Sequence, residues 1–260
     1  SDPEAKPQRS EKRRTSGPPQ RLFTENLLTI FRSGPCFKAV NILALLFGLC
    51  LFSMAFGQSL ENDYSEYFVA LGGFTSFAVL FATFTSWQVI LQATSDGLDE
   101  VDEWPENEKG LWLIFGLRMT GIFMLALSPG AILCWILLAV HSVAQLTATG
   151  PFLGLFTLVC FWILLPLFTI SVVDSGTIRD PISARVMWSV ARLWKKWLQL
   201  YALTGVLIAG YVGAITAFWQ VVESPIIRFP MPGVLYIYVS FLYFRLVGRL
   251  AWLGDHELRE

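Results

Sequence analysis

Charged side chains are scarce in this sequence: Asp, Glu, Lys and Arg make up 15% of its 260 residues, whereas 54% are hydrophobic. Soluble proteins carry about 25% charged residues. The few charges gather at residues 1–38 and 96–108, so that long uncharged apolar runs remain between and after them. This composition excludes a water-soluble enzyme, a secreted disulfide scaffold and a nucleic-acid-binding domain. It predicts a protein that crosses a membrane several times.

Residues that commonly carry catalysis or bind metals are also few. The four cysteines lack the spacing of a metal site, and we interpret them as buried thiols. His141 is one of only two histidines. No nucleophile elbow, zinc-protease motif or phosphate-binding glycine loop is present. The sequence therefore predicts no cofactor and no metal, and it favours a protein without enzymatic activity.

Six apolar segments are long enough to cross a bilayer. They cover residues 39–58, 67–91, 131–146, 152–173, 198–221 and 234–253. An α-helix rises about 1.5 Å per residue, so that about 20 residues match the hydrocarbon layer of roughly 30 Å. The predicted fold is an all-α, polytopic transmembrane helical bundle of about six spans.

The segment 110–127 allows two topologies. It is apolar, but Arg118 lies in its middle, and an arginine at the bilayer centre costs about 3 kcal/mol. Ser128-Pro129-Gly130 separates it from the segment 131–146. If 110–127 crosses fully, there are seven spans and the basic stretch 183–197 lies outside, against the positive-inside rule. We predict instead that 110–127 is a half-crossing or interfacial helix, which leaves six spans and places both termini in the cytoplasm.

The regions flanking the spans differ in charge and polarity. Residues 1–38 hold eight Lys or Arg and four Asp or Glu, and residues 1–20 contain no apolar residue larger than alanine except proline. We predict a disordered basic cytoplasmic tail at 1–20, a single transmembrane helical domain at 21–253 and a polar C-terminal tail at 254–260. At 21–33 we expect a short helix on the membrane surface.

An acidic segment at 95–109 contains seven Asp or Glu and one Lys. A calcium or magnesium site is one interpretation, but the acids do not alternate as they do in a calcium-binding loop. We favour a solvated loop in which Trp104 anchors at the membrane interface.

The segment 183–197 has the pattern of a helix that lies in the membrane plane. One helical face is apolar and the other is basic. Such a helix suits a surface of anionic lipid headgroups. We therefore expect headgroup contacts from Arg185, Arg192, Lys195 and Lys196.

Charged or ionisable residues within or beside the apolar segments are candidates for a polar pocket in the bundle core. These residues are Arg118, His141, Asp174, Arg245 and Arg249. Arg245 and Arg249 lie one helical turn apart, and either an anionic ligand or lipid phosphates at the membrane border would suit them. An ion pair among Arg118, Asp174 and Arg245 is a further option that no spacing requires. A lone histidine such as His141 is more often a hydrogen-bonded polar residue than a ligand.

Small residues at intervals of four predict close helix packing. They are Gly205, Ala209, Gly213 and Ala217 in the segment 198–221, and Ala78, Ala82 and Ser86 in the segment 67–91. Small side chains let a second backbone approach closely in lipid, where no hydrophobic drive brings helices together. Packing within the bundle is the favoured interpretation, and a contact between subunits is the alternative.

Three motifs carry a resemblance to a known family. They are Asp-Glu-Val-Asp-Glu-Trp-Pro at 99–105, the run from Pro-Phe-Leu to Phe-Trp-Ile-Leu-Leu-Pro at 151–166, and Tyr-Phe-Arg-Leu-Val-Gly-Arg-Leu-Ala-Trp at 243–252. Over residues 21–253 the chain resembles an uncharacterised bacterial family of multi-pass integral membrane proteins. The resemblance implies the architecture and a place in the bacterial cytoplasmic membrane, and it implies no activity.

The expected function is that of a membrane component without enzymatic activity that organises lipids or partner subunits. The expected partners are membrane lipids with anionic headgroups, together with a second copy of the chain or another membrane protein, and no nucleic acid. The alternative is a small solute permease whose pocket uses Arg118, His141 and Arg245.

Overall fold

The computed structural model describes residues 23, 27–31, 34–60, 64–98, 109–140, 143–178 and 180–257, which are mostly helical and contain no strand. The elements are η1 (Leu27–Phe31), α1 (Gly34–Ser59), α2 (Ser65–Ser95), α3 (Lys109–Val140), α4 (Val143–Ser175), α5 (Ala184–Arg192), α6 (Trp194–Val221), α7 (Pro225–Arg228) and α8 (Pro230–Glu257). Six of these helices are long and apolar enough to cross a membrane. The predicted all-α membrane bundle with about six spans is thereby confirmed.

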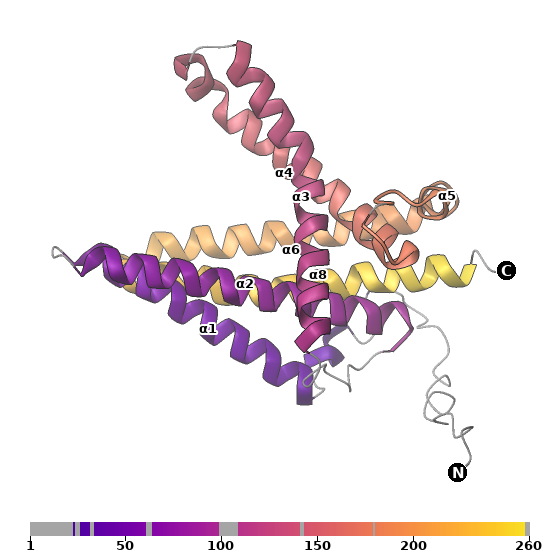
Figure 1. Cartoon of the computed structure of the whole chain (residues 1–260), viewed down its shortest axis with the longest axis horizontal. Coiled ribbons are helices and arrows are strands. Elements are labelled where there is room, and N and C mark those ends of the chain that lie inside the picture. Colours follow the sequence, from indigo (N-terminus) through magenta and orange to yellow (C-terminus); the bar gives the residue numbers. More distant parts are fainter. Residues whose placement is uncertain are drawn as a thin grey trace.

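The long helices form two groups (Figure 1). Helices α1, α2, α6 and α8 run along a common direction, and α8 contacts each of the other three. Helix α3 crosses α2 and pairs with α4 in a hairpin that extends away from the other helices. The start of α1, the ends of α2 and α8, and helix α5 lie at one end of the molecule, which we name the α5 end.

Glycines bring the backbones of α1, α2 and α8 together. A Cβ atom on Gly72 of α2 would lie 2.8 Å from the carbonyl oxygen of Cys50 and 3.0 Å from the backbone nitrogen of Met54, both on α1. A Cβ atom on Gly248 of α8 would lie 3.0 Å from the carbonyl oxygen of Leu91 on α2. These contacts follow the small-residue packing expected in lipid, although they use other residues than the two predicted series.

The predicted small residues differ in their surroundings. On α6, Gly205 lies against α4, where an added Cβ would be 3.3 Å from the ring of Trp162. The next three members of this series, Ala209, Gly213 and Ala217, are exposed.

The series on α2 passes from the surface to the interior. Ala78 is exposed, Ala82 is half-buried and Ser86 is buried. The Ser86 hydroxyl donates a hydrogen bond to the Ala82 carbonyl of its own helix at 2.9 Å. Within this series, burial therefore increases toward the α5 end.

The structure corrects the predicted division of residues 110–146. Helix α3 runs without interruption from Lys109 to Val140 and contains Pro129, so that the predicted half-crossing helix 110–127 and the separate span 131–146 are one helix. Proline removes the hydrogen bond that its nitrogen would donate to the carbonyl of Leu125. The hydroxyl of Ser128 donates to that same carbonyl at 2.7 Å. A serine beside the proline thus preserves the helix, as is common in membrane helices.

Three other predicted boundaries also move. Helix α4 begins at Val143 and passes the predicted break at 149–151, and α8 continues through Glu257, so that the predicted tail 254–260 begins inside a helix. The predicted surface helix 183–197 is two elements, because the backbone of Leu193 leaves the helical conformation between α5 and α6.

Some predictions fall largely on residues outside the described ones. The tail 1–20, the acidic residues 99–108 and His141 belong to this group. Of the predicted surface helix 21–33, Phe23 and η1 are described; Phe23 is buried in the core, and η1 contacts α1 and α8.

Candidate functional site

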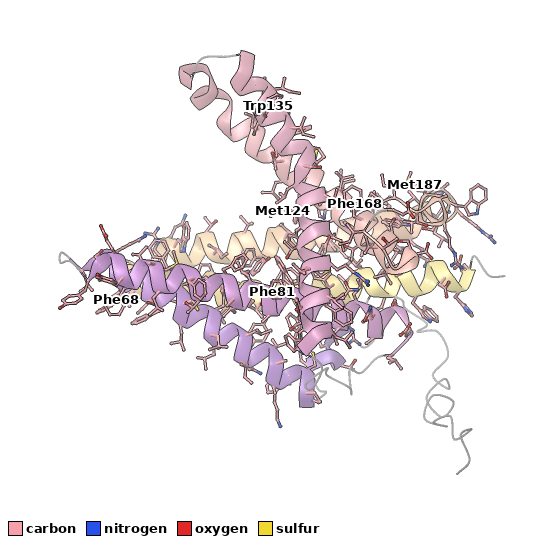
Figure 2. The ribbon with its side chains drawn as sticks, viewed as in Figure 1. Phe68, Phe81, Met124, Trp135, Phe168 and Met187 are labelled. Carbon is pink, nitrogen blue, oxygen red and sulfur yellow. The ribbon has the colours of Figure 1, made fainter. Side chains whose placement is uncertain are left out.

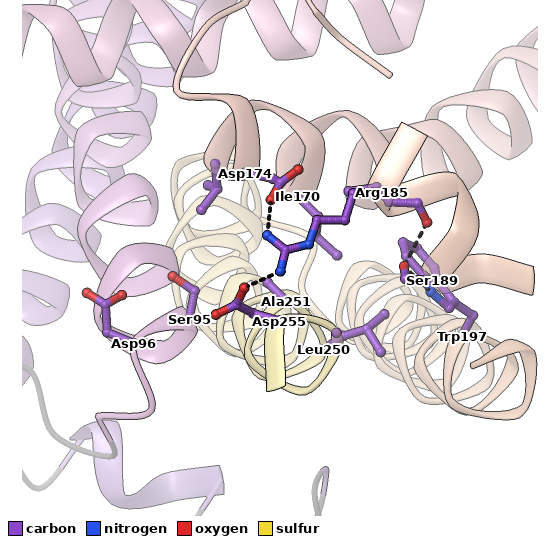
Figure 3. Close-up of a pocket in the computed structure, with 13 residues that line it drawn as sticks. Ser95, Asp96, Ile170, Asp174, Arg185, Ser189, Trp197, Leu250, Ala251 and Asp255 are labelled. Atoms are coloured by element: carbon purple, nitrogen blue, oxygen red, sulfur yellow. Dashed lines mark hydrogen bonds and ion pairs between the residues drawn. The ribbon is translucent and has the colours of Figure 1, made fainter. Parts of the chain in front are cut away.

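A cavity of about 250 Å³ opens at the α5 end of the bundle (Figure 3). Its polar lining consists of Ser95 and Asp96 at the end of α2, Asp174 on α4, Arg185 and Ser189 on α5, and Asp255 on α8. Apolar side chains, among them Ile170, Val186 and Leu250, line the remainder with the indole of Trp197. The cavity thus combines charged groups with an apolar wall.

Two glycines end the helices that deliver carboxylates to the cavity. Gly97 follows Asp96 with φ +79°; its N–H bonds the carbonyl of Thr94 at 3.1 Å, and the Leu98 N–H bonds that of Ala93 at 3.0 Å. This pair of hydrogen bonds is a Schellman motif, in which glycine takes the left-handed conformation. Gly176 ends α4 with φ +70° and a different cap, in which its N–H bonds the Val172 carbonyl at 3.0 Å.

Arg185 joins α5 to two other helices. Its Nη1 donates to Asp174 Oδ1 at 3.2 Å, and its Nη2 lies 2.9 Å from Asp255 Oδ1. Ser183 donates to the second oxygen of Asp174 at 2.7 Å. Because the Arg185 side chain is 41% exposed, each pair contributes about 1 kcal/mol or less to stability. The bonds mainly hold the start of α5 over the cavity, so that Arg185 is directed inward.

Asp96 differs from the other two carboxylates of the cavity. Among the described residues it forms no ion pair. Partial burial and the nearby charge of Asp255 raise the pKa of Asp96 above its ordinary value of 3.8. With Arg185 as the one cation among the lining residues, the three carboxylates leave an excess of negative charge.

The other residues predicted to form a polar pocket lie in different places. Arg118 Nη2 donates to the Gly176 carbonyl at 3.0 Å, and this contact with the C-terminal end of α4 is favourable for a cation. Arg245 is buried and donates to Thr29 of η1 at 2.8 Å. Arg249 is also buried. Asp174 pairs with Arg185, and not with Arg118 or Arg245 as the sequence left open.

The remaining predicted lipid contacts lie on the outside of the α5 end. Arg192 and Lys195 are exposed and Lys196 is half-buried. Met187 projects from the outer side of α5 (Figure 2). Two tryptophans near these cations, Trp188 and Trp194, are 62% and 57% exposed.

Sequence reasoning assigned Asp96 to a solvated loop and Asp255 to a tail, and so missed both as cavity residues. A signal for them exists. The apolar segments that become α2, α4 and α8 each end near an aspartate, at Asp96, Asp174 and Asp255. In the six-span topology these three segments run in the same direction, which places their C-terminal ends together.

No known family model, curated protein or solved structure matches this chain. The resemblance to a bacterial family of membrane proteins therefore stays a prediction from three motifs. Function is inferred from the described residues alone.

Proposed function

We propose that this protein is an integral membrane component without enzymatic activity that binds anionic lipid headgroups at its α5 end. One observation carries the proposal: exposed Trp188 and Trp194 lie in the same short stretch as the cations Arg192 and Lys195. Tryptophan favours the membrane interface, and lysine and arginine favour anionic headgroups there.

The way α5 packs supports this proposal. Val186 and Ser189 of α5 are buried against the bundle, and Ser189 accepts a hydrogen bond from the indole of Trp197 at 3.3 Å. This packing leaves Trp188 and Arg192 on the exposed part of the helix. The bundle thus holds α5 as a fixed surface, and headgroups need not order it when they bind.

The same cations support an orientation. Both the start of α1 and the end of α8 lie at the α5 end (Figure 1). Since basic residues near the ends of spans favour the cytoplasm, we propose that this end faces the cytoplasm. The permease alternative has less support, because Arg118 and Arg245 bond to different partners.

Neutralising the exposed cations tests the lipid proposal. A triple variant, Arg192→Gln with Lys195→Gln and Lys196→Gln, should lose most of the preference for phosphatidylglycerol over phosphatidylcholine. Each cation near an anionic surface contributes about 1 kcal/mol, so we expect a fall of roughly 100-fold at low salt. The preference is measured from quenching of tryptophan fluorescence by brominated lipids of each class in vesicles.

Arg228→Gln is the matched control. Arg228 lies in α7, away from the α5 end, with its guanidinium 5.2 Å from the ring of Trp219. This variant should keep the wild-type preference and its weakening by salt. An unchanged lipid preference in the triple variant would contradict the proposal.

The proposed orientation has its own test. A cysteine introduced at Met187, which is exposed on α5, should react with a membrane-impermeant maleimide only after the cell membrane is opened. A cysteine at exposed Val221, at the end of α6, should react in intact cells. The reverse pattern would overturn the proposed orientation.

A further inference from the structure

Helix α5 carries part of the surface proposed to bind lipid headgroups, yet it buries few of its own side chains. Only Val186 and Ser189 of its nine residues are buried, and both line the cavity of about 250 Å³. The chain leaves the helical conformation on both sides of α5, at Gly176 with φ +70° and at Leu193 with φ −106°. Helix α5 is thus no rigid continuation of α4 or α6, and other contacts must set its orientation.

Polar bonds connect the start of α5 to two other helices. The Ser183 N–H donates to Ser171 Oγ of α4 at 3.1 Å, and the Ser183 hydroxyl donates to Asp174 Oδ2 at 2.7 Å. The guanidinium of Arg185 reaches Asp174 Oδ1 on α4 at 3.2 Å and Asp255 Oδ1 on α8 at 2.9 Å (Figure 3). Four bonds therefore hold the first turn of α5 against α4 and α8.

The hydroxyl of Ser183 contributes to these bonds rather than to α5 itself. Ser183 occupies the N-cap position, where a serine side chain normally accepts a hydrogen bond from the first turn of its own helix. No such cap bond forms, and the hydroxyl donates to Asp174 instead. The first turn also carries Arg185, although the N-terminal end of a helix disfavours a cation. Both residues thus favour the attachment of α5 to the bundle over the stability of α5 as a separate helix.

We propose that Arg185 is a positioning residue of the lipid site, which bridges Asp174 and Asp255 and thereby fixes the orientation of α5. In this orientation Trp188 and Arg192 are exposed. The inference rests on the proposed lipid function, and it gives Arg185 a role other than the headgroup contact predicted from the sequence. A guanidinium suits this role, because its planar fork presents two Nη groups to two carboxylates at once, whereas a lysine carries its charge at one point.

Asp174→Asn separates a positioning role from a direct headgroup contact by the sign of its effect. If charge alone mattered, removal of an acid beside the cations would strengthen binding of an anionic lipid. Loss of the ion pair should instead weaken the preference for phosphatidylglycerol over phosphatidylcholine by about fivefold. Amide hydrogen exchange of residues 184–192 should accelerate by a similar factor. The preference is measured by the brominated-lipid assay, and the exchange by mass spectrometry of the full chain in the same vesicles.

Asp180→Asn is the matched control, because Asp180 is exposed in the stretch between α4 and α5. This variant removes the same charge at the same end of the molecule. It should keep the wild-type exchange of α5, with a lipid preference equal to that of the wild type or slightly higher.

Arg185→Lys provides a second test that keeps the charge of α5. Lysine would replace arginine in a direct headgroup contact, since each contributes similarly near an anionic surface. It cannot reproduce the bidentate bridge, so we expect the lipid preference to fall by about threefold and the exchange of α5 to accelerate. A weaker preference with faster exchange in both Asp174→Asn and Arg185→Lys would support the positioning role.

The triple variant of Arg192, Lys195 and Lys196 distinguishes failure of this inference from failure of the lipid function. If the triple variant loses its lipid preference while Asp174→Asn and Arg185→Lys behave as the wild type does, the lipid function stands and the positioning role is overturned. A stronger preference in Asp174→Asn than in Asp180→Asn would also overturn it. If the triple variant keeps the wild-type preference, the lipid function is overturned, and the role of Arg185 in it falls as well.

Discussion

Replacement of Gly72 by leucine is expected to prevent α1 and α2 from packing. A Cβ atom at this position would lie 2.8 Å from the Cys50 carbonyl oxygen and 3.0 Å from the Met54 nitrogen, and both are backbone atoms that no rotamer change moves away. Overpacking a well-filled interior costs about 1–3 kcal/mol or more, and the leucine would separate two helices along their contact. We expect a fall of roughly 10 °C or more in melting temperature in detergent, or a loss of the monodisperse peak in size-exclusion chromatography.

Gly213→Leu is the matched control in a second apolar helix. Nothing lies within 4 Å of a Cβ atom at Gly213, so the folded monomer should accommodate leucine with an unchanged melting temperature. The same variant tests the predicted subunit contact of α6: conversion of an oligomer to a monomer would support that contact. Equal melting temperatures for Gly72→Leu and Gly213→Leu would contradict the packing described for Gly72.

The predictable part of this fold follows from the length and hydropathy of its segments. Six candidate spans and their all-helical character are properties of segments of about 20 apolar residues. The boundary at Pro129 was wrong because a proline is normally read as a helix end. That expectation omits the hydroxyl of Ser128, which satisfies the Leu125 carbonyl.

The packing of the bundle was harder to predict than its spans. A series of small residues marks a face on which helices can approach, but it does not say which helix approaches or where. Glycines that lie close to the backbone of a neighbouring helix, such as Gly72 and Gly248, do not belong to either predicted series. Their role depends on which residues of α1 and α2 lie opposite, which is set by the tertiary arrangement.

The basic segment 183–197 shows a similar limit of prediction from sequence, because its arginines have different surroundings in the structure. The pattern of residues 183–197 placed Arg185 and Arg192 on one polar face, and both were expected at lipid headgroups. In the structure both side chains are exposed, but Arg185 also bonds Asp174 and Asp255. Helical periodicity assigns a face to a residue, but the acids that bond Arg185 belong to two other helices, Asp174 to α4 and Asp255 to α8, and periodicity within one helix does not place them.

The second large effect is expected at Trp87, which joins α2, α3 and α8. Its buried ring lies 4.6 Å from the ring of Phe244 and 5.4 Å from that of Phe123, measured between centroids, and its Nε1 donates to Ser240 Oγ at 2.9 Å. Trp87→Ala would remove these contacts and leave a void where the three helices meet. Large-to-small substitutions of this kind cost about 3–5 kcal/mol, which corresponds to a fall of roughly 10 °C or more in melting temperature.

Trp135→Ala is the control for Trp87→Ala, because it removes a tryptophan that is not packed in the core. Trp135 lies on the outer part of the α3 and α4 hairpin and is 72% exposed (Figure 2), so its removal should change the melting temperature by only a few degrees. Trp87→Phe should fall between the two alanine variants, because phenylalanine keeps an aromatic ring for stacking but lacks the indole donor to Ser240. Similar melting temperatures for Trp87→Ala and Trp135→Ala would show that the contacts of Trp87 with Phe123 and Phe244 do not hold α3 to the bundle. If Trp87→Phe is as unstable as Trp87→Ala, most of the stabilisation comes from the hydrogen bond to Ser240.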